Sequence, residues 1–265
     1  MGFGAMRITG PGIWGEPKDP TQARAVLRRT LELGVNFIDT ADAYGPEVSE
    51  RLIGETLHPY PPGLVIATKG GLVRPQASQW VDNGTPAHLR AACEQSLKRL
   101  RLERIDLYQL HAIDKNVPLE DSLGELARLQ KEGKIRHIGV SNFDLDELKR
   151  ARKVVNVVSV QNRYNVADRG SEDVLDYCTR ESIAFIPWAP LARGATATLA
   201  GRSHDAFAAT AAAHGVNDFQ LAIAWLLARS PAMLPIPGTS SVAHLEENVA
   251  AASIKLSEKE LAAIG

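Results

Sequence analysis

The chain has 265 residues, with 30 Lys and Arg against 31 Asp and Glu, so its formal net charge is −1 with histidine neutral. This balance excludes a globally basic nucleic-acid binder, and 45% hydrophobic with 23% charged residues excludes a disordered chain. Two cysteines cannot build a disulfide framework, and neither lies in a pattern with metal-ligand spacing, so no metal site is expected.

The N-terminal residues 1–7 lack the apolar core of a secretory signal. No apolar run approaches the about 18 residues that a membrane helix needs. We therefore expect a soluble, cytoplasmic protein that acts on a small molecule as a monomer or weak homo-oligomer, with neither a nucleic acid nor a membrane as its partner.

Short apolar segments recur along the chain and alternate with longer amphipathic segments. The short segments are four to six residues long and mostly apolar throughout, which is typical of parallel strands buried on both faces. The predicted strands cover residues 2–6, 35–38, 64–67, 105–110, 135–140, 157–160, 183–186 and 233–236.

Helix-start patterns fall between these strands at Asp19, Thr85 and Asn217, and after the last of them at Ser257. Each combines a capping side chain with a proline at the first helical position or a Gln or Glu three residues later. Because eight strand–helix alternations follow one another without a flexible linker, residues 1–265 are predicted to form a single-domain α/β structure, a (β/α)₈ TIM barrel. An open doubly wound sheet is disfavoured because its nucleotide fingerprint lacks the third glycine after Gly4.

Ionisable side chains follow three of the predicted strands in succession. Asp39 follows residues 35–38, with Tyr44 five positions further on, Lys69 lies just beyond residues 64–67, and His111 follows residues 105–110. The carboxyl ends of barrel strands meet at one mouth, so these four side chains are expected to converge. Each alone could be a cap or a surface group, but together they predict a catalytic cluster.

The chemistry of this cluster suits the reduction of a carbonyl group. Lys69 would stay protonated because Asp39 offsets the desolvation that otherwise lowers the pKa of a buried lysine. Its ammonium group would lower the pKa of the Tyr44 phenol toward neutrality and make it a usable general acid. A neutral His111 would hydrogen-bond the carbonyl oxygen of a substrate.

The strings around these residues, at 39–45 and 68–69, resemble those of the aldo-keto reductases. These are single-domain barrels that pass a hydride from NADPH to an aldehyde or ketone. The resemblance spans nearly the whole chain and places the family's Asp, Tyr, Lys and His tetrad on the four residues of the cluster. It implies a small-molecule carbonyl substrate and Tyr44 as the proton donor.

The resemblance also implies a cofactor site on the later strands. Polar side chains would hold the nicotinamide amide, Trp188 would stack on the ring, and a turn with the following helix N-terminus would receive the adenosine 2'-phosphate. The implied cofactor-binding residues are Ser141, Asn142, Gln161, Trp188, Pro190, Leu191, Gly238, Thr239, Ser240, His244, Glu247 and Asn248.

Two of these positions depart from well-known members of the family. Gly238 stands where many carry Lys, and His244 stands where many carry Arg. The loss of both fixed positive charges weakens the electrostatic case for a phosphorylated cofactor. NADPH is the expected cofactor, and NADH is the alternative.

Trp14 and Trp80, in loops after the first and third predicted strands, are the candidate walls of a substrate pocket. Arg74 and Lys115 lie in loops at the same mouth, where they could meet an anionic group. Residues 13–17, 161–165 and 238–241 together resemble a bacterial subgroup that includes a pyridoxal reductase. This resemblance implies pyridoxal or another aromatic aldehyde as substrate.

Two other functions stay open on the sequence alone. One is an aldolase with Lys69 as a Schiff-base lysine, although Asp39 would raise the pKa that such a lysine needs to have lowered. The other is a noncatalytic, reductase-like subunit that senses the cofactor, although the chain shows no extra arm or basic segment for a partner.

Overall fold

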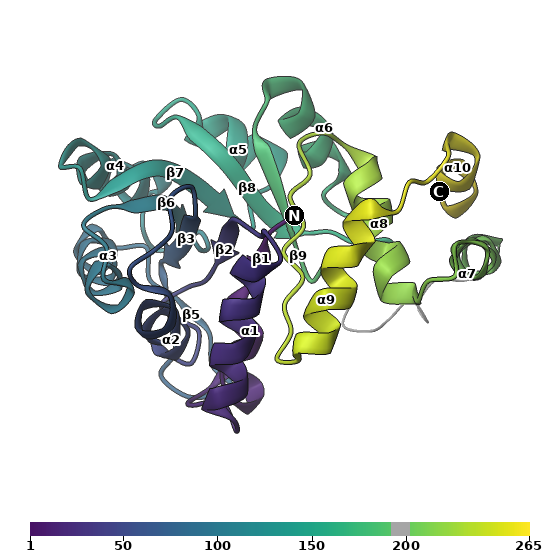
Figure 1. Cartoon of the computed structure of the whole chain (residues 1–265). Helices are drawn as coiled ribbons and strands as arrows, with labels where there is room; N and C mark the ends of the chain where they lie inside the picture. Colours follow the sequence, from purple (N-terminus) through teal and green to yellow (C-terminus); the bar gives the residue numbers. More distant parts are fainter. Residues whose placement is uncertain (192–201) are drawn as a thin grey trace.

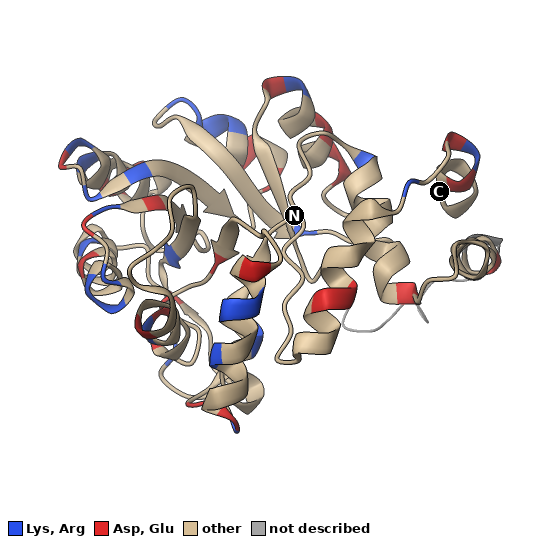
Figure 2. Cartoon of the chain, viewed as in Figure 1, with Lys and Arg blue, Asp and Glu red and all other residues tan. Residues whose placement is uncertain are grey.

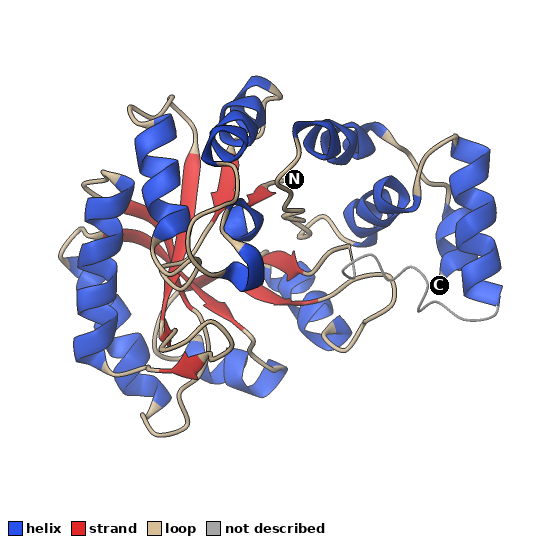
Figure 3. Ribbon diagram, turned by 90° about the horizontal axis from the view of Figure 1, so that it is seen from below, coloured by secondary structure: helices blue, strands red, loops and turns tan. Residues whose placement is uncertain are grey.

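The computed structural model describes residues 1–191 and 202–265. Within these ranges, seven parallel strands form one curled sheet, and helices cover its outer face (Figures 1 and 3). Each strand pairs with the next one along the chain, in the order β1 (Phe3–Gly4), β2 (Phe37–Asp39), β3 (Val65–Gly70), β6 (Ile105–Leu110), β7 (Ile135–Ser141), β8 (Val157–Arg163) and β9 (Ala184–Trp188). A short antiparallel hairpin of β4 (Leu72–Val73) and β5 (Val81–Asp82) follows β3.

The prediction of a regular eighth strand at residues 233–236 is wrong. The backbone around it nevertheless bonds to Phe185 of β9 at 2.8 Å and to Gly2 beside β1 at 2.9 Å. Pro235 and Pro237 have no N–H group to donate, so a continuous ladder cannot form here. The segment links the two edges of the sheet, and the predicted (β/α)₈ architecture is confirmed.

The predicted helix starts are confirmed by their caps. Asp19, Thr85, Asn217 and Ser257 each accept a hydrogen bond from a backbone N–H of the first helical turn. The helices are α1 (Pro20–Glu32), α2 (Val48–Leu57), α3 (Pro86–Leu100), α4 (Leu119–Lys131), α5 (Leu145–Ala151), α6 (Glu172–Glu181), α7 (Arg202–His214), α8 (Asp218–Arg229), α9 (Val242–Ala250) and α10 (Glu258–Ile264). Among the described residues, 3₁₀ turns lie at Ala5–Ile8, Pro11–Ile13 and Ala251–Ser253.

Helix α1 shows how apolar residues at helical spacing lead to packing of the helix against the sheet. Its buried residues Ala23, Val26, Leu27 and Thr30 recur at helical spacing, so one face of the helix turns toward the sheet. The charged residues of both signs lie mainly on the outer helices (Figure 2). In the described ranges, no helix is both long enough and apolar enough to cross a membrane.

Candidate active site

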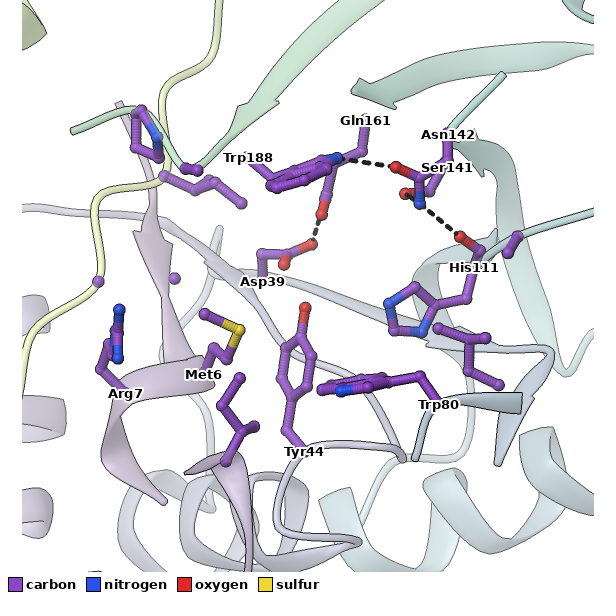
Figure 4. Close-up of a pocket in the computed structure, with 18 of the residues that line it drawn as sticks. Met6, Arg7, Asp39, Tyr44, Trp80, His111, Ser141, Asn142, Gln161 and Trp188 are labelled. Atoms are coloured by element: carbon purple, nitrogen blue, oxygen red, sulfur yellow. Dashed lines mark hydrogen bonds between the residues drawn. The ribbon is translucent and has the colours of Figure 1, made fainter. Parts of the chain in front are cut away.

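A cavity of about 530 Å³ opens at the carboxyl ends of the strands (Figure 4). It brings together three members of the predicted catalytic cluster and much of the predicted nicotinamide site. The predicted residues that line it are Asp39, Tyr44, Trp80, His111, Ser141, Asn142, Gln161, Trp188, Pro190, Leu191 and Gly238. Their convergence follows from the parallel sheet, which places every strand's carboxyl end at the same mouth.

Lys69 lies beneath the wall of this cavity and is fully buried. Its Nζ donates to Asp39 Oδ1 at 2.6 Å, to the Thr40 carbonyl oxygen at 2.9 Å and to the Tyr44 hydroxyl at 3.4 Å. All three donor positions of the ammonium group are therefore in use. The four residues come from β2, the loop after it and the neighbouring strand β3.

Asp39 is held by two amide side chains as well as by the lysine. Gln109 Nε2 donates to Asp39 Oδ2 at 3.1 Å, and Gln161 Nε2 donates to the same oxygen at 2.8 Å. Gln109 was missed by the sequence interpretation, although a polar residue inside the apolar strand 105–110 was a usable signal. Gln161, predicted to hold the nicotinamide amide, reaches across the barrel and also fixes the carboxylate.

The electrostatic predictions for Lys69 hold, but the one for Tyr44 is wrong. Burial alone would lower the pKa of Lys69, yet Asp39 and Tyr44 raise it above its usual value. Burial raises the pKa of the Tyr44 phenol, and the nearby ammonium group only partly opposes this effect. Tyr44 is therefore a protonated phenol at neutral pH, because desolvation outweighs the attraction of one ammonium group that Asp39 already neutralises.

His111 is neutral, as predicted. Burial and the positive charge of Lys69 hold its pKa well below the usual value. The His111 ring meets the Tyr44 ring edge-on, with 5.9 Å between the ring centroids. Its Nδ1 has no hydrogen-bond partner in the part of the chain that the structure describes. An unpaired buried nitrogen at a cavity wall can be satisfied by a bound molecule.

A chain of hydrogen bonds joins Trp188 to the predicted catalytic cluster. Trp188 Nε1 donates to Asn142 Oδ1 at 2.9 Å, and Asn142 Nδ2 donates to the His111 carbonyl oxygen at 3.0 Å (Figure 4). Asn142 has a positive φ of 63°, a conformation that asparagine adopts more readily than most residues. The backbone after β7 thus aims this amide across the cavity.

Apart from Gly238, the residues predicted to bind the adenosine end of the cofactor lie outside this cavity. The Thr239 hydroxyl accepts a bond from Ser241 N at 3.0 Å within the turn. His244 is exposed in the first turn of α9, where the Ser241 side chain caps the helix. Glu247 accepts a bond from Asn217 Nδ2 at 3.3 Å. Ser240 lines a second cavity, bordered mainly by residues after β1, and Asn248 is buried.

The two tryptophans predicted to form walls of the substrate pocket differ in whether they line the cavity. Trp80 lines the cavity and is 41% exposed. Trp14 does not line it and instead lies against the Arg74 guanidinium. Arg74 is buried and Lys115 is exposed, and neither lines the cavity where it could meet an anionic group. Burial of Arg74 depends on carbonyl groups from distant loops, which no local pattern reveals.

Other lining residues were missed by the sequence interpretation. Met6 and Arg7, which follow β1, project into the cavity (Figure 4). The available signal was their position, with Met6 as the last residue of the predicted strand 2–6 and Arg7 directly after it. In the described ranges, no group of three His, Cys, Asp or Glu side chains could hold a metal ion.

Comparison with known proteins identifies the family. The model of the Aldo/keto reductase family matches residues 1–265. The chain belongs to the aldo-keto reductase family. Membership makes it an oxidoreductase that acts on carbonyl or CH–OH groups, as predicted.

Two curated relatives are similar to this aldo-keto reductase over nearly its whole length. An uncharacterized oxidoreductase of Schizosaccharomyces pombe is 53% identical over 266 residues, covering 99% of this chain and 84% of the relative. Pyridoxine 4-dehydrogenase of Escherichia coli is 42% identical over 270 residues, covering 100% of this chain and 93% of the relative. The second similarity supports the predicted likeness to the pyridoxal reductase subgroup.

Solved structures agree with the fold. An aldo/keto reductase from Klebsiella pneumoniae, in complex with NADP and acetate, superimposes with a TM-score of 0.84 and 31% sequence identity. The match covers 99% of this chain and 89% of that structure.

Proposed function

We propose that this aldo-keto reductase reduces an aldehyde or ketone with NADPH, with Tyr44 as the proton donor and residues 1–265 acting as one unit. The observation that carries the proposal is the Tyr44 hydroxyl, which lies at a cavity wall 3.4 Å from the buried Lys69 ammonium group. A protonated phenol beside a cation can give up its proton and have the resulting phenolate stabilised.

The residues around the cavity fit a nicotinamide cofactor. The Ser141 hydroxyl and the amides of Asn142 and Gln161 line one wall, and the Trp188 indole lies beside them. Amide and hydroxyl groups can bond a carboxamide, and an indole face can stack on a flat ring. When bound, NADPH supplies the hydride for the reaction.

Each catalytic side chain has a distinct task in this proposal. Tyr44 donates its proton to the carbonyl oxygen as negative charge develops there, and the Lys69 ammonium group stabilises the phenolate. Asp39 keeps Lys69 protonated at a contact of 2.6 Å. Neutral His111 hydrogen-bonds the carbonyl oxygen and orients it toward the Tyr44 hydroxyl.

The choice of NADPH over NADH rests on the turn at 238–241 and the start of α9. A helix N-terminus and the exposed Ser240 and His244 offer donors to a phosphate group. The NADP complex of the Klebsiella pneumoniae relative supports the same choice. The similarity to pyridoxine 4-dehydrogenase supports pyridoxal or another aromatic aldehyde as substrate.

The contacts of Lys69 argue against the aldolase alternative. A Schiff-base lysine must expose a neutral amine to its substrate, whereas Lys69 is fully buried and uses all three donors. Its pKa is raised and not lowered.

The deciding experiment compares the wild type with Tyr44→Phe. We expect NADPH-dependent turnover of at least one compound in a panel of aromatic, aliphatic, dicarbonyl and pyridoxal substrates. The variant should lose about 10²- to 10⁴-fold in kcat, the range that general acid catalysis supplies. Its Kd for NADPH, from tryptophan fluorescence quenching, should stay within about twofold because the hydroxyl acts on the transition state.

Two outcomes would contradict the proposal. Unchanged turnover in Tyr44→Phe would exclude this residue as the proton donor. Tight NADPH binding with no turnover of any compound would favour the cofactor-sensing subunit.

A further inference from the structure

Arg74, directly after β4, is a buried cation with no acidic partner among the described residues. The side chain is 7% exposed. Burial lowers the pKa of its guanidinium, and no carboxylate in the described ranges offsets this. A buried unpaired charge is costly, so its other contacts must hold it in place.

The guanidinium group is bonded to backbone carbonyl oxygens of three separate loops. Two acceptors belong to the loop after β1, one belongs to the loop after β2, and two belong to the turn of the β4–β5 hairpin. The acceptors are Gly12, Ile13, Ala43, Ala77 and Gln79, with distances of 3.0 Å for Gln79, 3.2 Å for Ile13, 3.3 Å for Gly12 and 3.4 Å for Ala43. Ala43 directly precedes the proposed proton donor Tyr44.

The same guanidinium group stacks on an aromatic wall of the cavity. Arg74 Cζ lies 3.8 Å from the ring centroid of Trp80 and 5.5 Å from that of Trp14. Trp80 in turn makes edge contacts with Tyr44 and His111, at centroid distances of 6.5 Å and 6.4 Å (Figure 4). Arg74 thus contacts the wall of the cavity from behind and does not line the cavity itself.

We propose that Arg74 is a positioning residue that holds Trp80 and the loops after β1 and β2 as one wall of the substrate pocket. The proposal rests on the proposed carbonyl reduction and identifies what sets its substrate fit. Only a planar fork with five N–H donors can bond carbonyl groups of three loops while stacking on an indole. A flat aromatic aldehyde depends on the position of Trp80 more than a short aliphatic aldehyde does.

Kinetics of Arg74→Met and Arg74→Lys test this role. The methionine variant lacks every N–H donor of the guanidinium group. The lysine variant keeps the positive charge without the planar guanidinium, and it provides the test if the methionine variant does not fold. We expect KM for an aromatic aldehyde to rise about tenfold in both, equivalent to about 1.4 kcal/mol. KM for propanal and Kd for NADPH should each change less than about twofold. Equal effects on both aldehydes would overturn the proposal.

Arg152→Met is the matched control. Arg152 also lies over an aromatic ring, 5.4 Å from the centroid of Tyr177, and pairs with Glu181 on α6. None of these residues lines the cavity. The control should leave KM for both aldehydes unchanged. If it raises KM for the aromatic aldehyde as Arg74→Met does, the effect is general destabilisation and the proposal fails.

A double-mutant cycle with Trp80→Leu tests whether Arg74 acts through this tryptophan. The double variant Arg74→Met/Trp80→Leu should lose less than the product of the two single losses in kcat/KM, because the contact can be removed only once. Fully multiplicative losses would show that the two residues act independently and would overturn the proposal.

Hydrogen–deuterium exchange separates this proposal from the proposed function, because it needs no turnover. We expect amides of residues 72–82 to exchange faster in Arg74→Met than in the wild type, with exchange in α4 unchanged. Unchanged exchange of residues 72–82 would overturn the positioning role. If the wild type reduces no carbonyl compound, the proposed function fails and this exchange result alone decides the role of Arg74.

Discussion

At the scale of single residues, the proposed catalytic cluster is a buried ion pair that is hydrogen-bonded to the Tyr44 phenol. Lys69 and Asp39 are almost entirely excluded from solvent, and their atoms approach to 2.6 Å. Two amide donors, from Gln109 and Gln161, satisfy the second carboxylate oxygen. Because the carboxylate and the ammonium group are both desolvated, each one stabilises the charged form of the other.

Lys69→Met should therefore lower the stability of the fold as well as the rate of the reaction. The substitution leaves the Asp39 carboxylate buried without a cation, and breaking such a pair costs about 3–5 kcal/mol. Urea unfolding at pH 7 would measure this loss in the free energy of unfolding. The double variant Lys69→Met/Asp39→Asn removes both charges and should recover part of it. A double variant as unstable as the single one would contradict this account.

At the scale of elements, the barrel closes where two backbone segments touch. A Cβ on Gly238 would lie 2.4 Å from the Gly4 carbonyl oxygen, and a Cβ on Gly4 would lie 2.6 Å from the Ile236 carbonyl oxygen. Both contacts are shorter than real Cβ contacts, so β1 and residues 236–238 approach closely only because both positions are glycine. A lysine side chain at position 238 would not fit this backbone arrangement.

Gly238→Ala should lower the free energy of unfolding by about 1–3 kcal/mol, the usual cost of overpacking. The matched control is Gly124→Ala within α4, where an added Cβ meets no atom within 4 Å. That control should be neutral or stabilising by up to about 1 kcal/mol, because alanine favours a helix over glycine. Thermal unfolding of both variants would measure the difference. Equal stability of both variants would show that the approach of β1 is not constrained by residue 238.

At the scale of the whole molecule, buried neutral histidine couples stability to pH. Burial and Lys69 hold the pKa of His111 well below the usual histidine value of 6.5, and burial lowers the pKa of His88 as well. Below about pH 6.5 the unfolded chain binds protons that the folded chain does not. The stabilisation is therefore present above pH 6.5 and is lost as the pH falls.

His111→Asn should flatten this pH dependence. One such histidine contributes up to about 1.4 kcal/mol per pH unit to the slope of the unfolding free energy. Urea unfolding at pH 6.5 and pH 5.5 would compare the two slopes, with His137→Asn as a control at an exposed histidine of β7. Equal slopes in the wild type and His111→Asn would contradict a neutral, buried His111.

Local sequence patterns were enough to predict the seven parallel strands of the described sheet and the members of the proposed catalytic cluster. Strand segments, the caps at Asp19, Thr85, Asn217 and Ser257, and the polar residues after the strands are all local patterns. In a parallel barrel, chain order alone brings strand ends together, so convergence could be predicted without coordinates.

The environment of these groups depends on tertiary packing. The raised pKa of Tyr44 reflects desolvation by surrounding elements, and the role of Gln109 depends on a contact across the barrel with Asp39. Arg74 is buried because carbonyl groups from residues 12–13 and 43 reach it from other loops. Desolvation and long-range backbone contacts arise from packing between distant segments, which no local sequence pattern encodes.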